Sequence, residues 1–432
     1  MGTSSNVPNH GGGTIFATDA NGNAIGLLGP NGSIHKANLS NVLTAGPPDG
    51  NRIVTANSTQ YTYHIQQELE SNVSAIRLLI PNGDTSTIAG VKASVAFGEV
   101  LGAHGDADVI TPSGAWSAVT FSGSATVTLA AGTSGSLPSW TASDWIKIPS
   151  VPRTDGGERP VMHIRILSSG PISRISLNDF DDNQIIGSVP RVYRQRRQAV
   201  DGITTPANFT SNTWNDACHT ALVQYMTDVP GLCVAGFGDS IMSGTGATVR
   251  GNAWGLRGCT AVSSPEYPVQ WLNVGQASSA GDTWESKMSG LFTAMGTAYA
   301  PNVVLAPIGG PNSASNTLDA TEVNTMRGDM ALMRRTAKTL APDALLIPVT
   351  WLPENAASND YGSTDSLRRD YNASVKAGRE LIADVDSVLA GTMDVDGQVE
   401  YLAGSTTDGL HPNDTGHELL GAYLATVLQR IY

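Results

Sequence analysis

The hydrophobic pattern of this chain changes near residue 205, and the change predicts two different kinds of fold. After residue 205, short apolar runs alternate with longer amphipathic segments. Alternating strands and helices favour a parallel sheet covered by helices on both faces. The predicted strands are 232–237, 272–274, 303–308 and 344–349, and the predicted helices are 214–226, 285–295, 319–340, 366–389 and 414–429. We therefore expect one α/β domain over residues 205–432.

Residues 46–190 have a pattern typical of an all-β domain. Apolar and polar residues alternate in short runs separated by Gly, Pro and Asn, at 74–80, 91–97, 125–129, 145–148, 163–167 and 172–177. Short strands at this spacing indicate a β-sandwich of the jelly-roll type. Domains of this kind often bind carbohydrate or mediate assembly, although a fold does not by itself fix a function.

Two flanking segments complete the predicted organisation. Residues 1–45 are rich in Gly and Asn and carry hairpin-type turn signals, so they form either a small β appendage or a flexible arm. Residues 191–204 are predicted to be a solvated linker. Its basic cluster consists of Arg191, Arg194, Arg196 and Arg197.

The charge balance argues against nucleic acid or an anionic membrane as a partner. The 432 residues include 25 basic and 38 acidic ones, a net charge of −13, whereas both partners require basic patches. No apolar run reaches the length of about 18 residues that a membrane-spanning helix needs. Cys218, Cys233 and Cys259 are too few and too irregularly spaced for a disulfide framework or a metal site, so we expect small buried side chains.

The N-terminus does not have the basic and apolar segments of a signal peptide. Its glycine-rich composition suggests an extracellular or virion-associated protein of phage or bacterial origin. An oligomer is compatible with such a protein, although no heptad repeat supports one.

Four short segments lie where strands of the α/β domain are expected to end. They are Gly238–Ile241, Asn273–Gly275, Gly309–Asn312 and Asp408–Asn413. Together and in this order they resemble the blocks of the SGNH hydrolases, also called the GDSL esterase/lipase family. The resemblance covers residues 205–432 and implies a three-layer α/β hydrolase that needs neither metal nor cofactor.

Hydrolysis of an ester requires a nucleophile, a base and donors for the oxyanion. Ser240 can be the nucleophile, His411 can accept its proton, and Asp408 can orient the imidazole from one turn away. The resemblance implies that the oxyanion hole comprises the backbone amides of Ser240 and Gly275 and the side-chain amide of Asn312. Asn413 is the predicted N-cap of the last helix.

Several neighbouring residues allow alternatives. Ser313 follows Asn312 where the family usually has Asp, which puts a supporting hydrogen bond in question. His417, with Asp414 three residues before it, is the competing imidazole, and we interpret it as a surface residue of the last helix. Glu354 and Asp360 are expected on a solvated loop, or else at the substrate rim. Trp254 and Trp351 are expected in the core, or else at a substrate wall.

The expected function is a serine esterase that removes acetyl or similar small acyl groups from polysaccharide through an acyl-enzyme. The polar turns, low charge and preceding β domain favour this substrate over long-chain lipid. The alternative is a non-catalytic glycan-binding or virion structural protein with a vestigial hydrolase domain.

Overall fold

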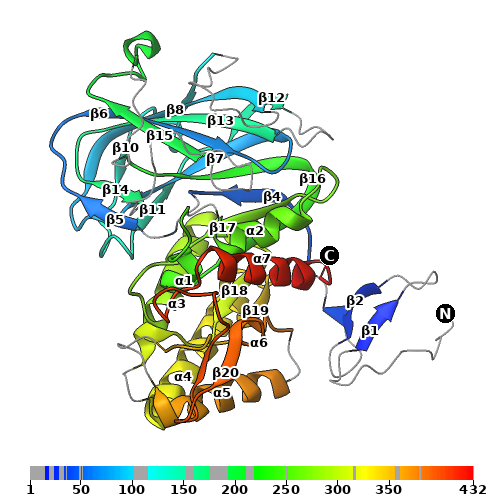
Figure 1. Ribbon diagram of the computed structural model, residues 1–432. Coiled ribbons are helices and arrows are strands. Elements are labelled where there is room, and N and C mark those ends of the chain that lie inside the picture. The colour runs from blue at the N-terminus through cyan, green and yellow to red at the C-terminus, as the bar shows by residue number, and fades with distance from the viewer. Residues whose placement is uncertain are drawn as a thin grey trace.

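The computed structural model describes most of the chain and places its two halves one above the other (Figure 1). The described residues are 15–18, 24–28, 34–35, 37–47, 50, 52–101, 115–151, 159–175, 193–210, 218–249, 252–314, 318–355, 361–378 and 381–431. Arg191, Asp360 and Trp214 lie outside them.

The C-terminal half contains a parallel sheet with the order β17-β16-β18-β19. The strands are β16 (Leu222–Gly236), β17 (Val269–Asn273), β18 (Val303–Pro307) and β19 (Leu345–Val349). The helices are α1 (Ser240–Ser243), α2 (Trp254–Val262), α3 (Gly281–Met295), α4 (Ala320–Leu340), α5 (Asp365–Ala377), α6 (Val385–Leu389) and α7 (Asp414–Leu428). The predicted α/β alternation is therefore confirmed. A two-stranded sheet, β20 (Ala390–Met393) with β21 (Val399–Tyr401), precedes α7.

Helices cover both faces of this sheet. At the end of β16, a Cβ on Gly236 would collide with the ring of Trp271, which also packs against Gly255 of α2. The next residue, Phe237, contacts Phe292 of α3 with ring centroids 5.6 Å apart. Because successive residues of an extended chain point to opposite faces, α2 and α3 lie on opposite sides of the sheet.

Helix α2 is not among the predicted helices, and its glycines explain why. Gly255 and Gly258 weaken the helical signal of the sequence. In the folded protein they allow close packing, because a Cβ at Gly258 would press on the side chain of Leu424 in α7. Tertiary packing therefore outweighs propensity in this segment.

Strand β16 belongs to both halves of the molecule. Leu222–Met226 pair antiparallel with β7 (Val73–Asn82) and β4 (Ser40–Ala45), while Leu232–Gly236 pair in parallel with β17. The predicted helix 214–226 is therefore wrong over residues 222–226, where strands on both sides satisfy the backbone. The pairings also cross the predicted boundaries at residues 45 and 205.

The N-terminal half is rich in strands and holds a six-stranded sheet. Its strands are β6 (Tyr61–Glu68), β8 (Ile88–Leu101), β9 (Ser117–Val119), β10 (Val127–Leu129), β13 (Arg159–Ser168) and β15 (Tyr193–Gln198). Strands β11 (Ser139–Ala142) and β12 (Ile146–Val151) join the sheet of β7 and β16, and β5 (Arg52–Thr55) pairs with β14 (Ile172–Ile175). The predicted strands of this half are thus present, several of them longer than expected.

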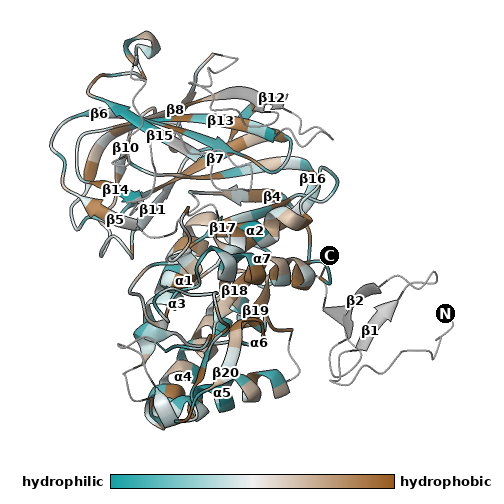
Figure 2. Ribbon diagram, in the orientation of Figure 1, coloured by the Kyte–Doolittle hydropathy of each residue, from teal (hydrophilic) through white to brown (hydrophobic). Residues whose placement is uncertain are grey.

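The predicted solvated linker 191–204 is wrong over β15, which pairs antiparallel with β6. Its many Arg and Gln residues give it a polar sequence (Figure 2). Arg196 is nevertheless only 4% exposed, and its Nε donates to Nδ1 of His64 at 3.1 Å. Pairing with β6 therefore buries part of a segment whose sequence is typical of a solvated linker.

Near the N-terminus, β1 (Ile15–Thr18), β2 (Ala24–Leu28) and β3 (Ile34–His35) form a small antiparallel sheet set apart from the main body (Figure 1). Of the two alternatives predicted for residues 1–45, a β appendage and a flexible arm, these three strands form the β appendage. The three cysteines are buried, as expected.

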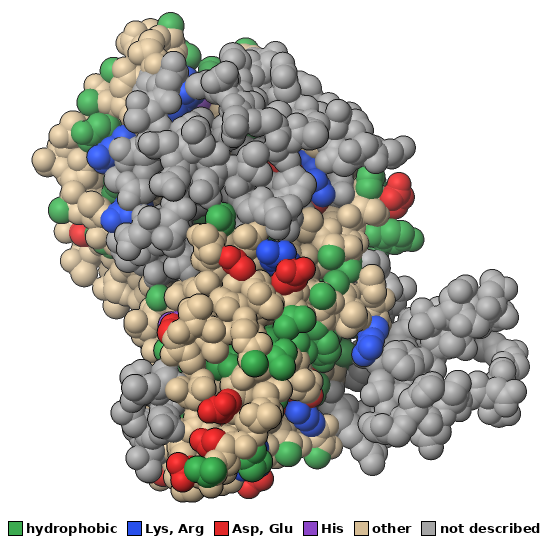
Figure 3. Space-filling view, viewed as in Figure 1, with side chains coloured by type: hydrophobic (Ala, Val, Ile, Leu, Met, Phe, Trp, Pro, Cys, Tyr) green, Lys and Arg blue, Asp and Glu red, His purple; other side chains and the backbone are tan. Residues whose placement is uncertain are grey.

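Charged side chains are scattered over the face shown in Figure 3, and its Lys and Arg do not gather into one patch. Within the described residues, no helix is both long and apolar enough to cross a bilayer.

Glu354, on the loop after β19, is fully buried rather than solvated. Its carboxyl group accepts hydrogen bonds from Trp351 Nε1 and from the Tyr361 hydroxyl, the latter at 2.5 Å. Burial raises its pKa to about 8, against the partial opposition of these two hydrogen bonds. Glu354 is thus a neutral structural acid of the core at acidic and neutral pH.

This burial predicts a pH-dependent stability. Because the folded-state pKa of Glu354 lies above that of the unfolded chain, its contribution is complete below about pH 4.5 and is lost as pH rises through about 8. Glu354→Gln should unfold within about 1 kcal/mol of the wild type at pH 5 and should be the more stable protein at pH 8.5. Urea titrations at the two pH values measure this crossover. Glu418→Gln, the same charge change on an exposed part of α7, should show none.

Candidate active site

The end of β16 presents Ser240 on a one-turn helix. Asp239 caps α1, and its Oδ1 accepts a hydrogen bond from the amide of Ile241 at 2.9 Å. Gly244 ends the turn with a φ of 97°, a left-handed conformation that suits glycine. This tight strand–turn–helix places the Ser240 side chain at the carboxyl edge of the parallel sheet, where α/β folds carry their ligands.

The loop before α7 supplies the two other predicted catalytic residues. Asp408 Oδ1 accepts hydrogen bonds from the amides of Leu410 and His411, at 2.9 and 2.8 Å. Asn413 caps α7 by accepting from the amide of Gly416 at 3.1 Å, which confirms the predicted N-cap. The loop is therefore held by its own short polar side chains.

The structure brings these residues, 171 positions apart, into one hydrogen-bonded chain. His411 Nε2 lies 2.9 Å from Ser240 Oγ, and His411 Nδ1 lies 2.7 Å from Asp408 Oδ2. With a proton on Nδ1, the imidazole donates to the carboxylate and its Nε2 lone pair faces the serine hydroxyl. This is the order of contacts in which a histidine can accept the serine proton.

The electrostatics of the loop keep Asp408 ionised. Partial burial works against its charge, but hydrogen bonds from the His411 side chain, the His411 amide and the Leu410 amide outweigh it and lower the pKa of Asp408 to about 2. The carboxylate is therefore ionised, and available to orient the imidazole, at mildly acidic and neutral pH.

Asp239 has the opposite environment, because it is buried. Desolvation raises its pKa to about 6, partly offset by the amide of Ile241 and the charge of His411. Gly310 lies directly against it, and a Cβ at that position would collide with Asp239 Oδ2. The Gly309–Asn312 segment thus packs against the turn that carries Ser240.

The loop after β17 also holds that turn. The amide of Gln276 donates to the carbonyl of Gly238 at 2.9 Å, and Ser279 Oγ lies 3.1 Å from the same oxygen. Gly275 packs against the backbone of Met242 and Ser243, where a Cβ would not fit. Its amide donates to Asn273 Oδ1 at 3.0 Å, within its own segment.

A second glycine at the end of this loop, which the sequence reasoning missed, lies beside Ser313, the residue after Asn312. Gly281 is the first residue of α3, and its amide donates to Ser313 Oγ at 3.1 Å. Asn312 itself is exposed, on the 3₁₀ turn Pro311–Ser313 that follows β18. Ser313 therefore supplies a hydrogen bond between the two loops. A glycine opening a helix after a strand-end loop is the signal that could have identified Gly281.

The residues that the sequence offered as alternatives, His417, Trp254 and Trp351, are buried. His417 is fully buried, not on the surface as expected, and its Nε2 lies 3.1 Å from the carbonyl of Thr245. Trp254 and Trp351 are 2% and 1% exposed, which confirms core packing. Both also line a narrow cavity with Asp239.

Among the residues that the structure describes, no group of three or more His, Cys, Asp or Glu could hold a metal ion.

Comparisons with known proteins locate a family domain on these residues. Residues 237–419 match the model of the GDSL-like Lipase/Acylhydrolase family. A comparison with curated proteins gives no match.

Among solved structures, the chain is similar to a member of the lipolytic protein G-D-S-L family from Veillonella parvula DSM 2008, at 20% identity over 46% of this chain and 98% of that one, with a TM-score of 0.34. It is similar to a GDSL-like lipase from Bacteroides thetaiotaomicron VPI-5482, at 15% identity over 46% and 88%, with a TM-score of 0.33. A carbohydrate esterase family 2 enzyme plus carbohydrate binding domain from Corynascus thermopiles (Myceliophthora fergusii) is similar at 11% identity over 90% and 98%, with a TM-score of 0.34.

The matched segment contains all five of the predicted site residues, Ser240, Gly275, Asn312, Asp408 and His411. Residues 237–419 of this chain form a domain of the GDSL-like lipase/acylhydrolase family, which is a family of carboxylic ester hydrolases.

Proposed function

We propose that the protein is a serine esterase that removes small acyl groups, acetyl above all, from carbohydrate through an acyl-enzyme. The observation that carries the proposal is the hydrogen-bonded chain from Ser240 Oγ through His411 to Asp408.

In the first half of the reaction, Ser240 Oγ attacks the ester carbonyl carbon as its proton passes to His411 Nε2. The new C–O bond forms a tetrahedral intermediate, and the imidazolium is stabilised by Asp408. Collapse breaks the bond to the alcohol, which leaves with the proton from Nε2. Water then attacks the acyl-enzyme with His411 as base, which releases the carboxylic acid and restores Ser240.

The oxyanion of the tetrahedral intermediate needs hydrogen-bond donors around it. The amide of Ser240 and the side-chain amide of Asn312 are two of them. For the third, we favour the amide of Gly281 over the predicted Gly275. Gly275 packs against the far end of α1, whereas the Gly281 amide opens α3 at its positive end and donates to the Ser313 hydroxyl, which an oxyanion could replace as acceptor.

The substrate class follows from the surroundings of the site. Ser240 is only 7% exposed, and a nucleophile this enclosed favours a small acyl group over a long alkyl chain. The low content of charged residues suits a polyhydroxylated alcohol half. The strand-rich half would then be a β-sandwich that positions the polymer. In support, one apolar core includes Ile65 and Ile164 of the six-stranded sheet together with Leu78 and Ile80 of the sheet of β16.

Ser240→Ala should lower kcat on 4-nitrophenyl acetate by at least about 10⁴-fold, because the covalent route is lost. Ser243→Ala is the matched control. Ser243 lies one turn further along α1, and its hydroxyl donates to the Ser240 carbonyl at 2.9 Å instead of meeting His411. It should retain kcat within about tenfold. Equal turnover by wild type and Ser240→Ala would instead indicate a vestigial domain.

Gly281→Pro tests the third oxyanion donor. Proline is tolerated at the first position of a helix, and Ala280 before it has φ −107° and ψ 172°, an extended conformation that proline permits. The substitution removes the amide proton, so kcat should fall by about 10²–10³-fold while the fold persists.

Gly281→Ala is the control for this variant. It adds a Cβ at the same place, 2.5 Å from the movable carboxylate oxygen of Asp329, but keeps the amide. Circular dichroism and thermal unfolding should match between the two variants. If Gly281→Pro and Gly281→Ala have the same kcat, the third donor is not Gly281.

A further inference from the structure

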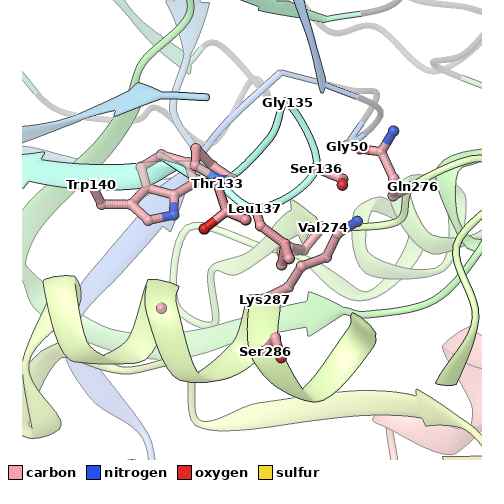
Figure 4. Close-up of a pocket in the computed structure, with 12 residues that line it drawn as sticks. Gly50, Thr133, Gly135, Ser136, Leu137, Trp140, Val274, Gln276, Ser286 and Lys287 are labelled. Atoms are coloured by element: carbon pink, nitrogen blue, oxygen red, sulfur yellow. The ribbon is translucent and has the colours of Figure 1, made fainter. Parts of the chain in front are cut away.

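A pocket outside the Ser240–His411–Asp408 site lies at the junction of the two halves of the molecule (Figure 4). Its volume is about 320 Å³, within the range of small-molecule binding sites. One wall is the 133–140 segment of the strand-rich half, which includes Thr133, Ser136 and Trp140. The other wall consists of Val274 and Gln276, after β17, and the middle of α3.

The pocket is connected to the catalytic turn through the loop after β17. Val274 and Gln276 line it, and the residue between them, Gly275, packs against the backbone of α1. The Gln276 amide also holds the carbonyl of Gly238, two residues before Ser240. From the strand-rich half, Gly50 lies so close to Gly275 that a Cβ on it would be 2.5 Å from the Gly275 carbonyl oxygen. A ligand in the pocket therefore contacts the loop that holds the carbonyl of Gly238, two residues before Ser240.

The chemistry of the lining selects the ligand. The indole of Trp140 provides a flat apolar surface. The polar groups of the same lining are the hydroxyls of Thr133, Ser136 and Ser286, the side-chain amide of Gln276 and the ammonium-bearing chain of Lys287, with Ser136 and Gln276 at the end away from Trp140 (Figure 4). None of the twelve lining residues is acidic. Many hydrogen-bonding groups beside one aromatic face fit a ring that has hydroxyls at its edge and C–H groups on its faces.

An alkyl chain is the less suitable occupant. It would displace water from the hydroxyls that line the pocket without offering them a hydrogen bond, and an unsatisfied polar group costs about 1–3 kcal/mol. A sugar ring offers each of these groups a partner.

We propose that this pocket is a glycosyl subsite, built jointly by the two halves, that binds a sugar ring of the acylated substrate while Ser240 attacks the ester. This inference rests on the proposed esterase function and specifies its alcohol half. It also gives the strand-rich half a direct part in substrate selection through Trp140.

The test compares sugar esters with esters that cannot fill the pocket. The sugar esters are glucose pentaacetate and the acetates of cellobiose and xylobiose, and the small esters are 4-nitrophenyl acetate and ethyl acetate. The wild type should hydrolyse at least one sugar acetate with a kcat/KM about tenfold or more above that of ethyl acetate. Trp140→Ala should lower this kcat/KM at least about tenfold, mainly through KM, and should leave 4-nitrophenyl acetate within about threefold.

Trp145→Ala is the matched control, because Trp145 is also a half-buried indole between the two halves but lies outside the pocket, against Tyr299 and Arg77. It should leave the preference for sugar esters intact. The subsite is excluded if the wild type shows no preference for sugar acetates, or if Trp140→Ala keeps that preference. An equal loss on all esters in both tryptophan variants would likewise exclude it, as general damage to the junction. A wild type inactive on every ester would overturn the esterase function itself, which separates the two failures.

Discussion

Strand β16 is the element on which the rest of the structure depends. Over fifteen residues it pairs first with β7 and β4 and then with β17 and β18, so a single backbone crosses from the strand-rich half into the hydrolase sheet. Its carboxyl end leads directly into Asp239 and Ser240. The nucleophile is therefore attached to a strand whose other end is fixed in a different sheet, and the two halves share one hydrogen-bonded ladder instead of meeting through a flexible linker.

Side chains reinforce this shared strand at several points. Arg77 of β7 donates to Gln224 Oε1 of β16 at 2.7 Å and to the carbonyl of Met295 at the end of α3, where a positive charge is favourable. Its guanidinium also stacks on Tyr299, 4.7 Å from the ring centroid. On the other side of the junction, Glu70 Oε2 accepts from the hydroxyl of Ser263, just after α2, at 2.8 Å. The strand-rich half thus makes hydrogen bonds to the helical layers on both faces of the hydrolase sheet.

Local patterns predicted the parts of this protein that local chemistry determines. The four parallel strands, most helices after residue 232, the N-cap Asn413 and the spacing of Asp408 and His411 were readable because each depends on neighbours in sequence. The exceptions are α2, which was not predicted, and the predicted helix 366–389, which is wrong between α5 and α6. The approach of Ser240 to His411 was predicted only through the resemblance to a family, since 171 residues separate them.

Long-range packing determined what the sequence did not reveal. Residues 222–226 are a strand because β7 and β4 flank them, and β15 is a strand because β6 accepts its polar sequence. His417 and Glu354 look like surface residues by type, but the fold buries both. His417 Nε2 lies against the Thr245 carbonyl, and Glu354 accepts hydrogen bonds from Trp351 and Tyr361. Our proposal of Gly281 instead of Gly275 as an oxyanion donor likewise rests on a long-range contact, the hydrogen bond from the Gly281 amide to Ser313.

The same geometry connects specificity with catalysis. The carbonyl of Gly238 is held by the loop after β17, and that loop lines the pocket beside Trp140. A ring bound in the proposed subsite would therefore contact the loop that also holds the turn of Ser240. Binding energy from a distant part of a substrate accelerates a reaction only where it fixes the reacting atoms in place. A subsite on the loop that holds the turn of the nucleophile would meet that requirement, and a carbohydrate-binding module on a flexible tether would not.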